Sequence, residues 1–463
     1  MPRRKTKPLA TPLPLERNQC SAWWHVGDFG FVIAVVAYIL IGTPFVPFHP
    51  DEAMQIYASG DYDIATGSGG PKALATRPPY PLDSDGHLRI LNGTVHRHFV
   101  GFLRQLAGIG PEHLPPRPGW NWALDLRGNA AGGYLPSGEL LMLGRLASSL
   151  SLALCVFPTF VIGWLVGRRP AAWLFTALFL LNPAVLINGR RAMQEGSMLL
   201  FGMIVILLAF LMARLILANK NPAFGWWVAL ALGGGMAVAS KHIGLAFLAG
   251  GGAIILSATA HQHTRRNLLA NLTGLVVALA VAGAVFLILS PALWDHPSAR
   301  LGDLIATRAE LIRLLDDGRH GGALRCAERI LTMPFVFSPQ FFEVADWASN
   351  PGVFDGIAHY AASRLGGLPL GSLLGWAITG FAAFGAYRIA VQRDFQKPDR
   401  SVHHLILVWW ATTALLLIAN PLPWQRYYLP LIPPTALLAV VGVLLSWNWL
   451  RKLSFWPKRI QKS

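Results

Sequence analysis

Long apolar runs alternate with short polar segments along most of this chain. A helix that crosses a bilayer needs roughly 20 apolar residues, and about ten runs in the sequence approach that length. The pattern therefore predicts an all-α protein with about ten transmembrane spans. We place the spans at about 29–47, 139–166, 171–187, 196–217, 224–239, 243–257, 268–289, 369–390, 405–419 and 429–445.

Two long loops interrupt this pattern, at about 48–136 and 291–368. In the first, residues 95–106 carry apolar side chains at positions 95, 99, 102, 103 and 106, which form one stripe on a helix. In the second, residues 301–315 show a similar stripe beside Arg308, Glu310 and Arg313. We expect amphipathic helices next to the membrane here. A helix packed inside a loop domain is the alternative for residues 95–106.

Composition and charge fit a membrane protein. The 463 residues are 53% hydrophobic and 13% charged, about half the charged fraction of a typical soluble domain. The net charge of +16 comes from clusters at segment ends. That distribution is typical of loops kept in the cytoplasm and does not favour nucleic-acid binding. We divide the chain into a basic tail (1–27), a transmembrane domain (28–447) and a second basic tail (448–463), with both long loops outside.

This orientation brings polar clusters to the outer ends of several spans. The acidic cluster Asp51-Glu52 follows the first span, and each of the others follows or precedes a later one. Simpler explanations exist: a helix-exit loop, a helical pair four residues apart, a snorkelling lysine or an interfacial aromatic belt. The clusters are Asp51-Glu52, Arg190-Arg191 with Glu195, Lys241-His242, Trp294-Asp295-His296, and Trp424 to Tyr428.

Together these clusters have the chemistry of a phosphate-handling site. Arginine and lysine bind phosphate through charge-assisted hydrogen bonds. A carboxylate beside them can accept a proton from an incoming nucleophile. Group transfer from a phosphate ester needs a base, cations and positioning, and the clusters supply these groups.

The same motifs resemble the polyprenyl-phosphate-dependent glycosyltransferases of the GT-C superfamily, which include protein O-mannosyltransferases and lipid A aminoarabinose transferases. The motifs are Asp51-Glu52 at the start of the first long loop, the stretch from Gly189 to Glu195, Ser240-Lys241, and Arg426-Tyr427-Tyr428-Leu429-Pro430 before the last span. The resemblance implies a polyprenyl-phosphate sugar donor and an inverting displacement at the anomeric carbon.

The resemblance also implies roles for individual residues. Asp51 would be the catalytic acid, acting as the base or holding a divalent metal ion, and Glu52 would support it. Arg190, Lys241 and Arg426 would bind the donor phosphate, with Tyr427 beside it. Further support would come from Arg191, Glu195 and His242. One more acid of the first loop contributes in some relatives, and Asp83, Asp85, Asp125 and Glu139 are equally eligible.

The sequence thus predicts a glycosyltransferase that moves a sugar to an acceptor outside the cytoplasm. We expect it in a bacterial cytoplasmic membrane, in contact with membrane lipid. The acceptor class (protein, lipid or glycan) and the sugar stay open. A transporter or lipid flippase is the first alternative, but its ionisable groups should lie at mid-membrane, and no repeated halves are evident. A non-catalytic membrane scaffold is the second.

Overall fold

The computed structural model describes residues 22–82, 84–262, 264–317, 351–370, 373–391, 398–420, 422 and 424–452. Within these ranges the regular elements are helices, and no strand is present. Seven helical stretches are long and apolar enough to cross a membrane, and two shorter apolar helices join them. One of the seven, Gly138–Leu180, covers two of the predicted spans. The prediction of an all-α, multi-pass membrane protein is confirmed.

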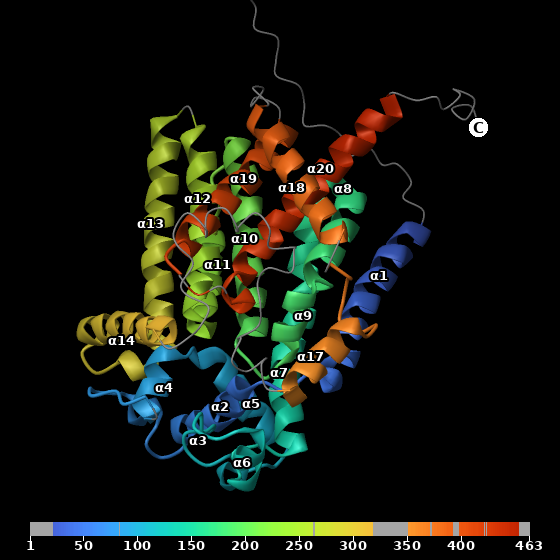
Figure 1. Ribbon diagram of the computed structural model, residues 1–463. Coiled ribbons are helices and arrows are strands. Elements are labelled where there is room, and N and C mark those ends of the chain that lie inside the picture. The colour runs from blue at the N-terminus through green and yellow to red at the C-terminus, as the bar shows by residue number, and fades with distance from the viewer. Residues whose placement is uncertain are drawn as a thin grey trace, which may run out of the picture.

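The long helices form one bundle. Figure 1 shows that the first residues of α1 and the last residues of α20 lie at one end of it. The bundle helices are α1 (Ala22–Ile41), α7 (Gly138–Leu154), α8 (Val156–Leu180), α9 (Pro183–Arg190), α10 (Glu195–Leu217), α11 (Phe224–Ser240), α12 (Leu245–Ala260), α13 (Arg265–Ile288), α18 (Leu373–Val391), α19 (Pro398–Leu417) and α20 (Ile432–Lys452).

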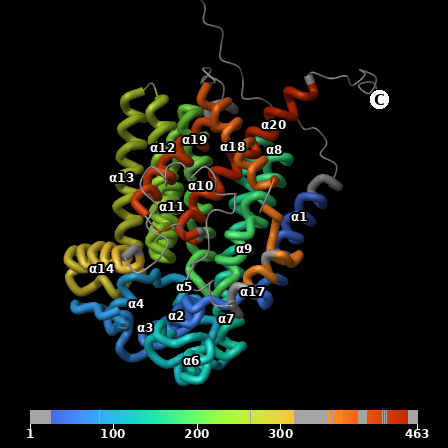
Figure 2. The backbone as a smooth tube through the Cα atoms, in the orientation of Figure 1, coloured from blue at the N-terminus to red at the C-terminus, as the bar shows by residue number. Residues whose placement is uncertain are grey.

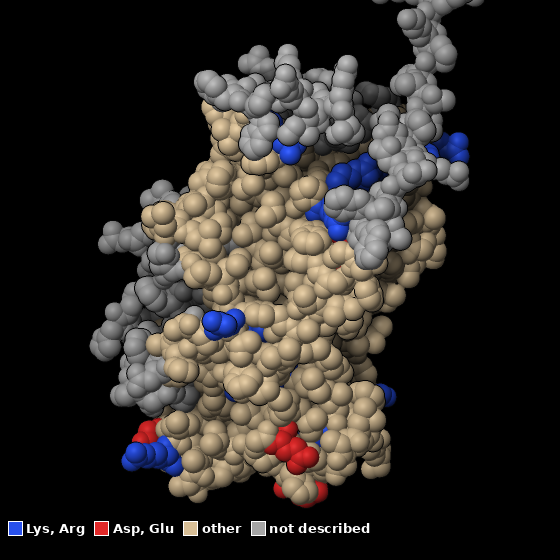
Figure 3. Space-filling view, turned by 90° about the vertical axis from the view of Figure 1, so that its right-hand side faces the viewer, with Lys and Arg blue, Asp and Glu red and all other residues tan. Residues whose placement is uncertain are grey.

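Helices from both long loops gather at the opposite end of the bundle (Figure 2). We call this part the loop domain. In the face seen in Figure 3, carboxylates appear near the loop domain, and most of the bundle surface bears neither acidic nor basic side chains. The helices of the loop domain are α2 (Pro50–Ala58), α3 (Gly60–Thr66), α4 (Asp85–Leu91), α5 (Thr94–Leu106), α6 (Leu126–Ala131), α14 (Pro297–Asp317) and α17 (Pro351–Ala362).

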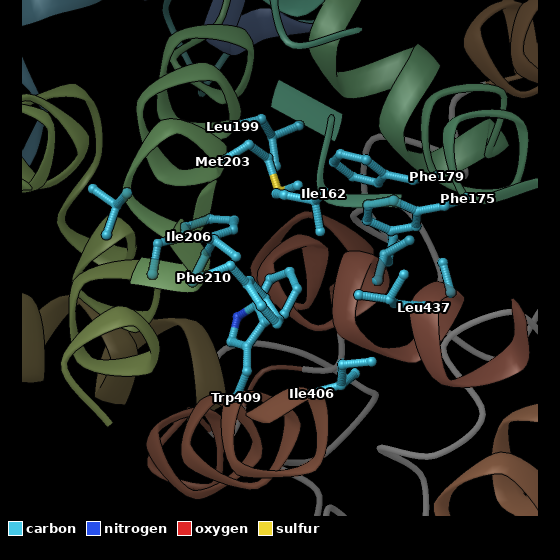
Figure 4. Close-up of a cluster of buried hydrophobic side chains, with 14 of the residues drawn as sticks. Ile162, Phe175, Phe179, Leu199, Met203, Ile206, Phe210, Ile406, Trp409 and Leu437 are labelled. Atoms are coloured by element: carbon cyan, nitrogen blue, oxygen red, sulfur yellow. The ribbon is translucent and has the colours of Figure 1, made fainter. Parts of the chain in front are cut away.

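The core of the bundle is apolar and aromatic. Phe175 and Phe179 stack with ring centroids 6.1 Å apart, and Phe210 meets Trp409 edge-on at 6.4 Å. Figure 4 shows these rings among aliphatic side chains from α8, α10, α19 and α20. This packing joins the middle of the chain to its C-terminal helices. Both parts contribute to the site described below.

The predicted third span is broken. The spacing predicts one helix over 171–187, but α8 ends at Leu180 and α9 begins at Pro183. Proline is favoured at the first position of a helix, and the Asn182 side chain caps α9 by accepting the Ala184 N–H at 2.9 Å. The break directs α9 toward the loop domain (Figure 1), and α9 ends at Arg190.

Both amphipathic stretches are helical, as predicted. Helix α5 packs against α3, α7 and α11. Its buried side carries Arg97 and Arg104, whereas the apolar residues Phe102 and Leu106 are exposed. The arginines reach acids of α3: Arg97 Nη1 lies 3.2 Å from Asp61 Oδ2. Helix α5 is therefore packed within the loop domain and still presents an apolar edge.

Candidate active site

Helix α2 places the first acidic pair. Its capping box begins at His49, whose Nδ1 accepts the Asp51 N–H at 3.1 Å, and the His49 N–H donates to Glu52 Oε2 at 2.9 Å. Pro50 occupies the first turn, where its missing N–H costs nothing. Because Asp51 and Glu52 are adjacent on a helix, their side chains point in different directions. The two carboxylates therefore have different surroundings.

The Asp51 carboxylate lines a cavity and pairs with Arg426 of η7 (Gln425–Tyr427). Its side chain is 25% exposed. Burial acts to raise the pKa of Asp51, but the attraction of Arg426 is supported by His49, and the pKa lies below the usual range of aspartate. Asp51 is therefore ionised at neutral pH. Its ion pair joins the first loop to the segment before the last span.

Lys241 and Glu195 form a second ion pair in the same cavity. Lys241 follows α11, and its Nζ lies 5.6 Å from the centroid of the Tyr427 ring. The Arg426 guanidinium is 5.5 Å from the centroid of the same ring, and Tyr427 stacks on Trp424. These cation–π contacts hold both cations against one aromatic surface.

The cavity that these groups line has a volume of about 400 Å³. It brings together five predicted site residues: Asp51, Glu195, Lys241, Arg426 and Tyr427. Uncharged polar side chains continue the polar wall, among them Gln194 and its hydrogen-bond acceptor Asn92. The other wall is apolar, and it consists of Leu82, Leu88, Leu91, Trp122, Leu311 and Leu315.

Arg308 also lines the cavity, although no sequence motif gave it a role. It lies on α14, is half-buried, and donates from Nη2 to the Leu91 carbonyl oxygen at 2.7 Å. Burial lowers the pKa of Arg308, and the charge of Arg426 acts in the same direction. Among the described residues no carboxylate forms an ion pair with Arg308. Lys241 and Arg426 are both paired with acids, so Arg308 gives the cavity an excess of one positive charge.

Glu52 lies outside the cavity and is fully buried. Arg145 of α7 binds both of its carboxylate oxygens, at 2.8 and 3.1 Å. The Ala192 N–H donates to the same group at 2.9 Å. With the His49 N–H, these donors occupy Glu52 completely. The carboxylate therefore connects α2, α7 and the α9–α10 corner, which agrees with a supporting role.

Arg190 and Arg191 are buried in the α9–α10 corner and do not line the cavity. Arg190 donates to the carbonyl oxygens of Ile39 and Leu365 at 2.9 and 2.6 Å, and also to Tyr38 O and the Tyr360 hydroxyl. Arg191 Nε donates to Pro47 O at 3.0 Å. The donors of Arg190 are thus directed at the protein itself.

His242 also lies outside the cavity lining. Its ring meets Phe286 edge-on, with centroids 5.9 Å apart. It packs beside Lys241 rather than adding a polar group to the cavity wall.

The further first-loop acids lie away from the cavity. Asp85 accepts from the Tyr57 hydroxyl at 2.7 Å, Asp125 caps α6, and Glu139 is exposed. Asp83 lies outside the described residues. In the described ranges no group of three or more His, Cys, Asp or Glu side chains is arranged to hold a metal ion. Within these ranges the partner of Asp51 is the Arg426 guanidinium, which is not a metal ligand.

The fold and the cavity define a multi-pass integral membrane protein with a charged site at one end of its helical bundle. A family model described as "Dolichyl-phosphate-mannose-protein mannosyltransferase" matches residues 127–295. The matched segment includes Glu195 and Lys241 of the cavity. The resemblance predicted from the motifs is therefore confirmed over this part of the chain. No curated protein matches the sequence.

The fold is similar to that of one solved structure, and two further structures match with lower scores. The chain is 14% identical to the oligosaccharyltransferase of Archaeoglobus fulgidus in the apo form, with a TM-score of 0.50 over 93% of this chain and 51% of that one. ArnT from Cupriavidus metallidurans, bound to undecaprenyl phosphate, gives 16% identity and a TM-score of 0.49 over 92% and 62%. The Pmt1–Pmt2 protein O-mannosyltransferase complex of S. cerevisiae gives 12% and 0.42 over 58% and 34%. The chain thus spans less than two thirds of each of these structures.

Proposed function

We propose that this protein is a glycosyltransferase that moves a sugar from a polyprenyl-phosphate donor to an acceptor outside the cytoplasm. The observation that carries the proposal is the cavity, where Asp51, Lys241, Arg308 and Arg426 meet beside an apolar wall. The family match over residues 127–295 supports the same reaction class. The basic tails favour an orientation with the loop domain outside, and we propose a bacterial cytoplasmic membrane.

The charge of the cavity supports a phosphodiester donor. A sugar linked to a lipid through one phosphate carries one negative charge, which the excess charge from Arg308 matches. Charge-assisted hydrogen bonds from Arg308, Arg426 and Lys241 would hold the phosphate. The apolar wall, with Leu311 and Leu315, would accept the first part of the lipid chain. Arg190 has no place in this phosphate site, because its donors already bind protein oxygens.

In the proposed reaction the acceptor hydroxyl attacks the anomeric carbon and Asp51 takes its proton. The bond from the anomeric carbon to the phosphate oxygen breaks, and polyprenyl phosphate leaves with the electron pair. Asp51 is a weak base while Arg426 neutralises it. When the donor phosphate shares Arg426, this attraction weakens and the proton affinity of Asp51 rises. No step uses a metal ion, and a divalent ion at Asp51 stays a prediction.

The replacement Asp51→Asn tests the base. It keeps the shape of the side chain and removes the proton acceptor, so transfer should slow by about 10²- to 10⁴-fold. The measurement is single-turnover transfer from a polyprenyl-phosphate sugar by the full chain in nanodiscs, with donor binding measured separately. Full activity of Asp51→Asn would rule out Asp51 as the base.

The transporter alternative is not favoured, because the charges of the cavity lie at one end of the bundle. A vesicle assay that shows substrate translocation without a glycosylated product would reverse this order.

A further inference from the structure

A second cavity, of about 640 Å³, lies in the loop domain. It is bounded by the end of α2, by α3, by α4 and by the proline-rich segment 111–117. Figure 1 shows these helices clustered at the end of the molecule opposite the last residues of α20. Neither the sequence motifs nor the proposed transfer reaction assigns it a role.

The two cavities share one wall. Asp51 and Tyr57 lie on the same helix, six residues and about 9 Å apart along its axis, and they line the first and the second cavity respectively. On α4, Leu88 lines both cavities. The Tyr57 hydroxyl donates to Asp85 at 2.7 Å and ties the two helices together. A ligand in the second cavity would therefore lie one helix away from the proposed catalytic base.

Charges in the second cavity balance. Three aspartates and three arginines line it. Asp61 pairs with Arg89 at 2.7 Å and with Arg97 at 3.2 Å, and Asp85 lies 3.8 Å from Arg117. The first cavity differs, because Arg308 gives it an excess positive charge. A balanced cavity selects neither anions nor cations strongly, which favours an uncharged ligand.

One ion pair of this cavity, Asp61 with Arg97, is buried, whereas Asp85 and Arg117 are exposed. Asp61 is 5% exposed and Arg97 1% exposed. In the described part of the chain, Arg97 Nε finds no hydrogen-bond partner. Burying charged groups is costly, and an apolar replacement is often as stable. This buried pair therefore gives the cavity wall a carboxylate and a guanidinium in fixed positions.

The remaining wall supplies hydroxyl and apolar groups. Ser68 is exposed at the rim, and Tyr57 contributes its hydroxyl. Prolines and aliphatic side chains also line the cavity: Pro111, Leu114, Pro115, Pro116 and Ile64. Fixed polar groups beside small apolar surfaces suit a sugar, whose hydroxyls need donors and acceptors and whose C–H faces need apolar contact.

We propose that the second cavity binds a neutral oligosaccharide, as the acceptor or as part of it. Identifying this ligand as the acceptor rests on the proposed function, but oligosaccharide binding can be tested without it. It narrows the acceptor class left open by the sequence to a glycan or a glycosylated molecule.

The experiment measures oligosaccharide binding to the full chain in nanodiscs. The probes are neutral hexose oligosaccharides, their sulfated forms, and a set of peptides that contain serine and threonine. Ser68→Trp fills the cavity from its exposed rim without touching an ion pair. Thr66→Trp is the matched control, because Thr66 is exposed on α3 but does not line the cavity.

We expect neutral oligosaccharides to bind, Ser68→Trp to weaken them about tenfold or more, and Thr66→Trp to leave binding unchanged. Tyr57→Phe, which removes one hydroxyl, should weaken binding by a smaller factor. A preference for sulfated probes or peptides would overturn the proposal, as would the absence of oligosaccharide binding or equal effects of the two tryptophan variants.

Undecaprenyl phosphate binding, measured on the same preparation, separates this inference from the proposed function. Lipid phosphate binding without any oligosaccharide binding would overturn only the second-cavity proposal. Oligosaccharide binding that follows the expected pattern would support the second-cavity proposal whether or not the lipid phosphate binds. Failure of the lipid phosphate to bind would contradict the proposed function.

Discussion

Two groups of arginines at the same end of the molecule have opposite surroundings. In the α9–α10 corner, Arg190 is fully buried and donates to backbone carbonyls and a tyrosine hydroxyl. In the cavity, Arg426 is 15% exposed and pairs with a carboxylate that is itself accessible. Arg308 has one backbone acceptor. The same side chain therefore fixes the fold in one region and is available to a ligand in the other.

The difference follows from what each guanidinium must satisfy. A buried arginine needs acceptors for its donors, because an unpaired charge in the interior is costly. Arg190 obtains them from α1 and from the segment after α17. A binding arginine must keep part of its capacity for the ligand. Arginines at the same end of the molecule can thus have unrelated roles.

Glu52 gives the largest expected effect on stability. Glu52→Gln would leave Arg145 buried without its carboxylate, and breaking a buried pair costs about 3–5 kcal/mol. We expect a clear fall in the melting temperature of the purified protein. Glu139→Gln is the control, since Glu139 is exposed, and its effect should stay within about 0.5 kcal/mol. An unchanged melting temperature with lost transfer would instead make Glu52 a catalytic residue.

The cavity arginines should affect ligand binding instead. In the proposed function Arg426 and Arg308 bind the donor phosphate, and hydrogen bonds of this kind contribute about 1.5–3 kcal/mol. Arg426→Ala and Arg308→Ala each remove one of these groups. We expect undecaprenyl phosphate to bind about 10- to 100-fold more weakly, with a smaller loss of acceptor binding. The matched variant is Arg190→Ala, with lipid binding measured on the folded fraction of the protein.

Arg190→Ala should lower the melting temperature while the remaining folded protein keeps its affinity for the lipid. Equal losses of donor affinity in Arg190→Ala and Arg426→Ala would contradict the distinction between the two regions. Equal losses of donor and acceptor binding in Arg426→Ala would contradict its role at the phosphate.

Local sequence patterns predicted most of the fold and part of the site. The apolar runs located the bundle helices, because a bilayer demands a fixed length of apolar helix. The order of the motifs on one side of the membrane brought Asp51, Lys241 and Arg426 into one group, and the structure places all three on one cavity. Their positions at helix ends made this possible.

The rest depends on contacts that spacing does not encode. Arg308 lies within the apolar stripe of α14, four residues after Leu304 and four before Ile312, and the spacing does not say what its guanidinium meets. The hydrogen bond from Arg308 to Leu91 O, formed where α14 approaches α4, makes Arg308 a cavity residue.

Other features had a local signal in the sequence. For Glu52, the His49-x-x-Glu52 spacing is a signal of a helix cap. The Asn182-Pro183 pair likewise signalled the start of α9.

The smallest expected effect is on the pH dependence of stability. It distinguishes the buried interior of the loop domain, which contains His96, from the cavity. His96 on α5 is fully buried, and burial lowers its pKa to about 4 from a model-peptide value of 6.5. The unfolded chain therefore takes up a proton below about pH 6.5, whereas the folded protein does so only near pH 4. His96 alone should lower the free energy of unfolding by about 1 kcal/mol at pH 5.5 relative to pH 7.5. His49 and His98, whose pKa values are also lowered by burial, act in the same direction.

Asp51 should not contribute to this change, because its pKa lies below the usual aspartate range and it stays ionised at pH 5.5. His96→Gln should therefore reduce the pH dependence of the melting temperature, and His113→Gln, at an exposed site, should leave it unchanged. At low donor concentration the transfer rate reports the free protein, in which Arg426 holds Asp51 ionised, so this rate, corrected for the folded fraction, should stay level between pH 7.5 and 5.5. A fall in the corrected rate that Asp51→Asn abolishes would show that Asp51 titrates in this range and that Arg426 does not hold it ionised.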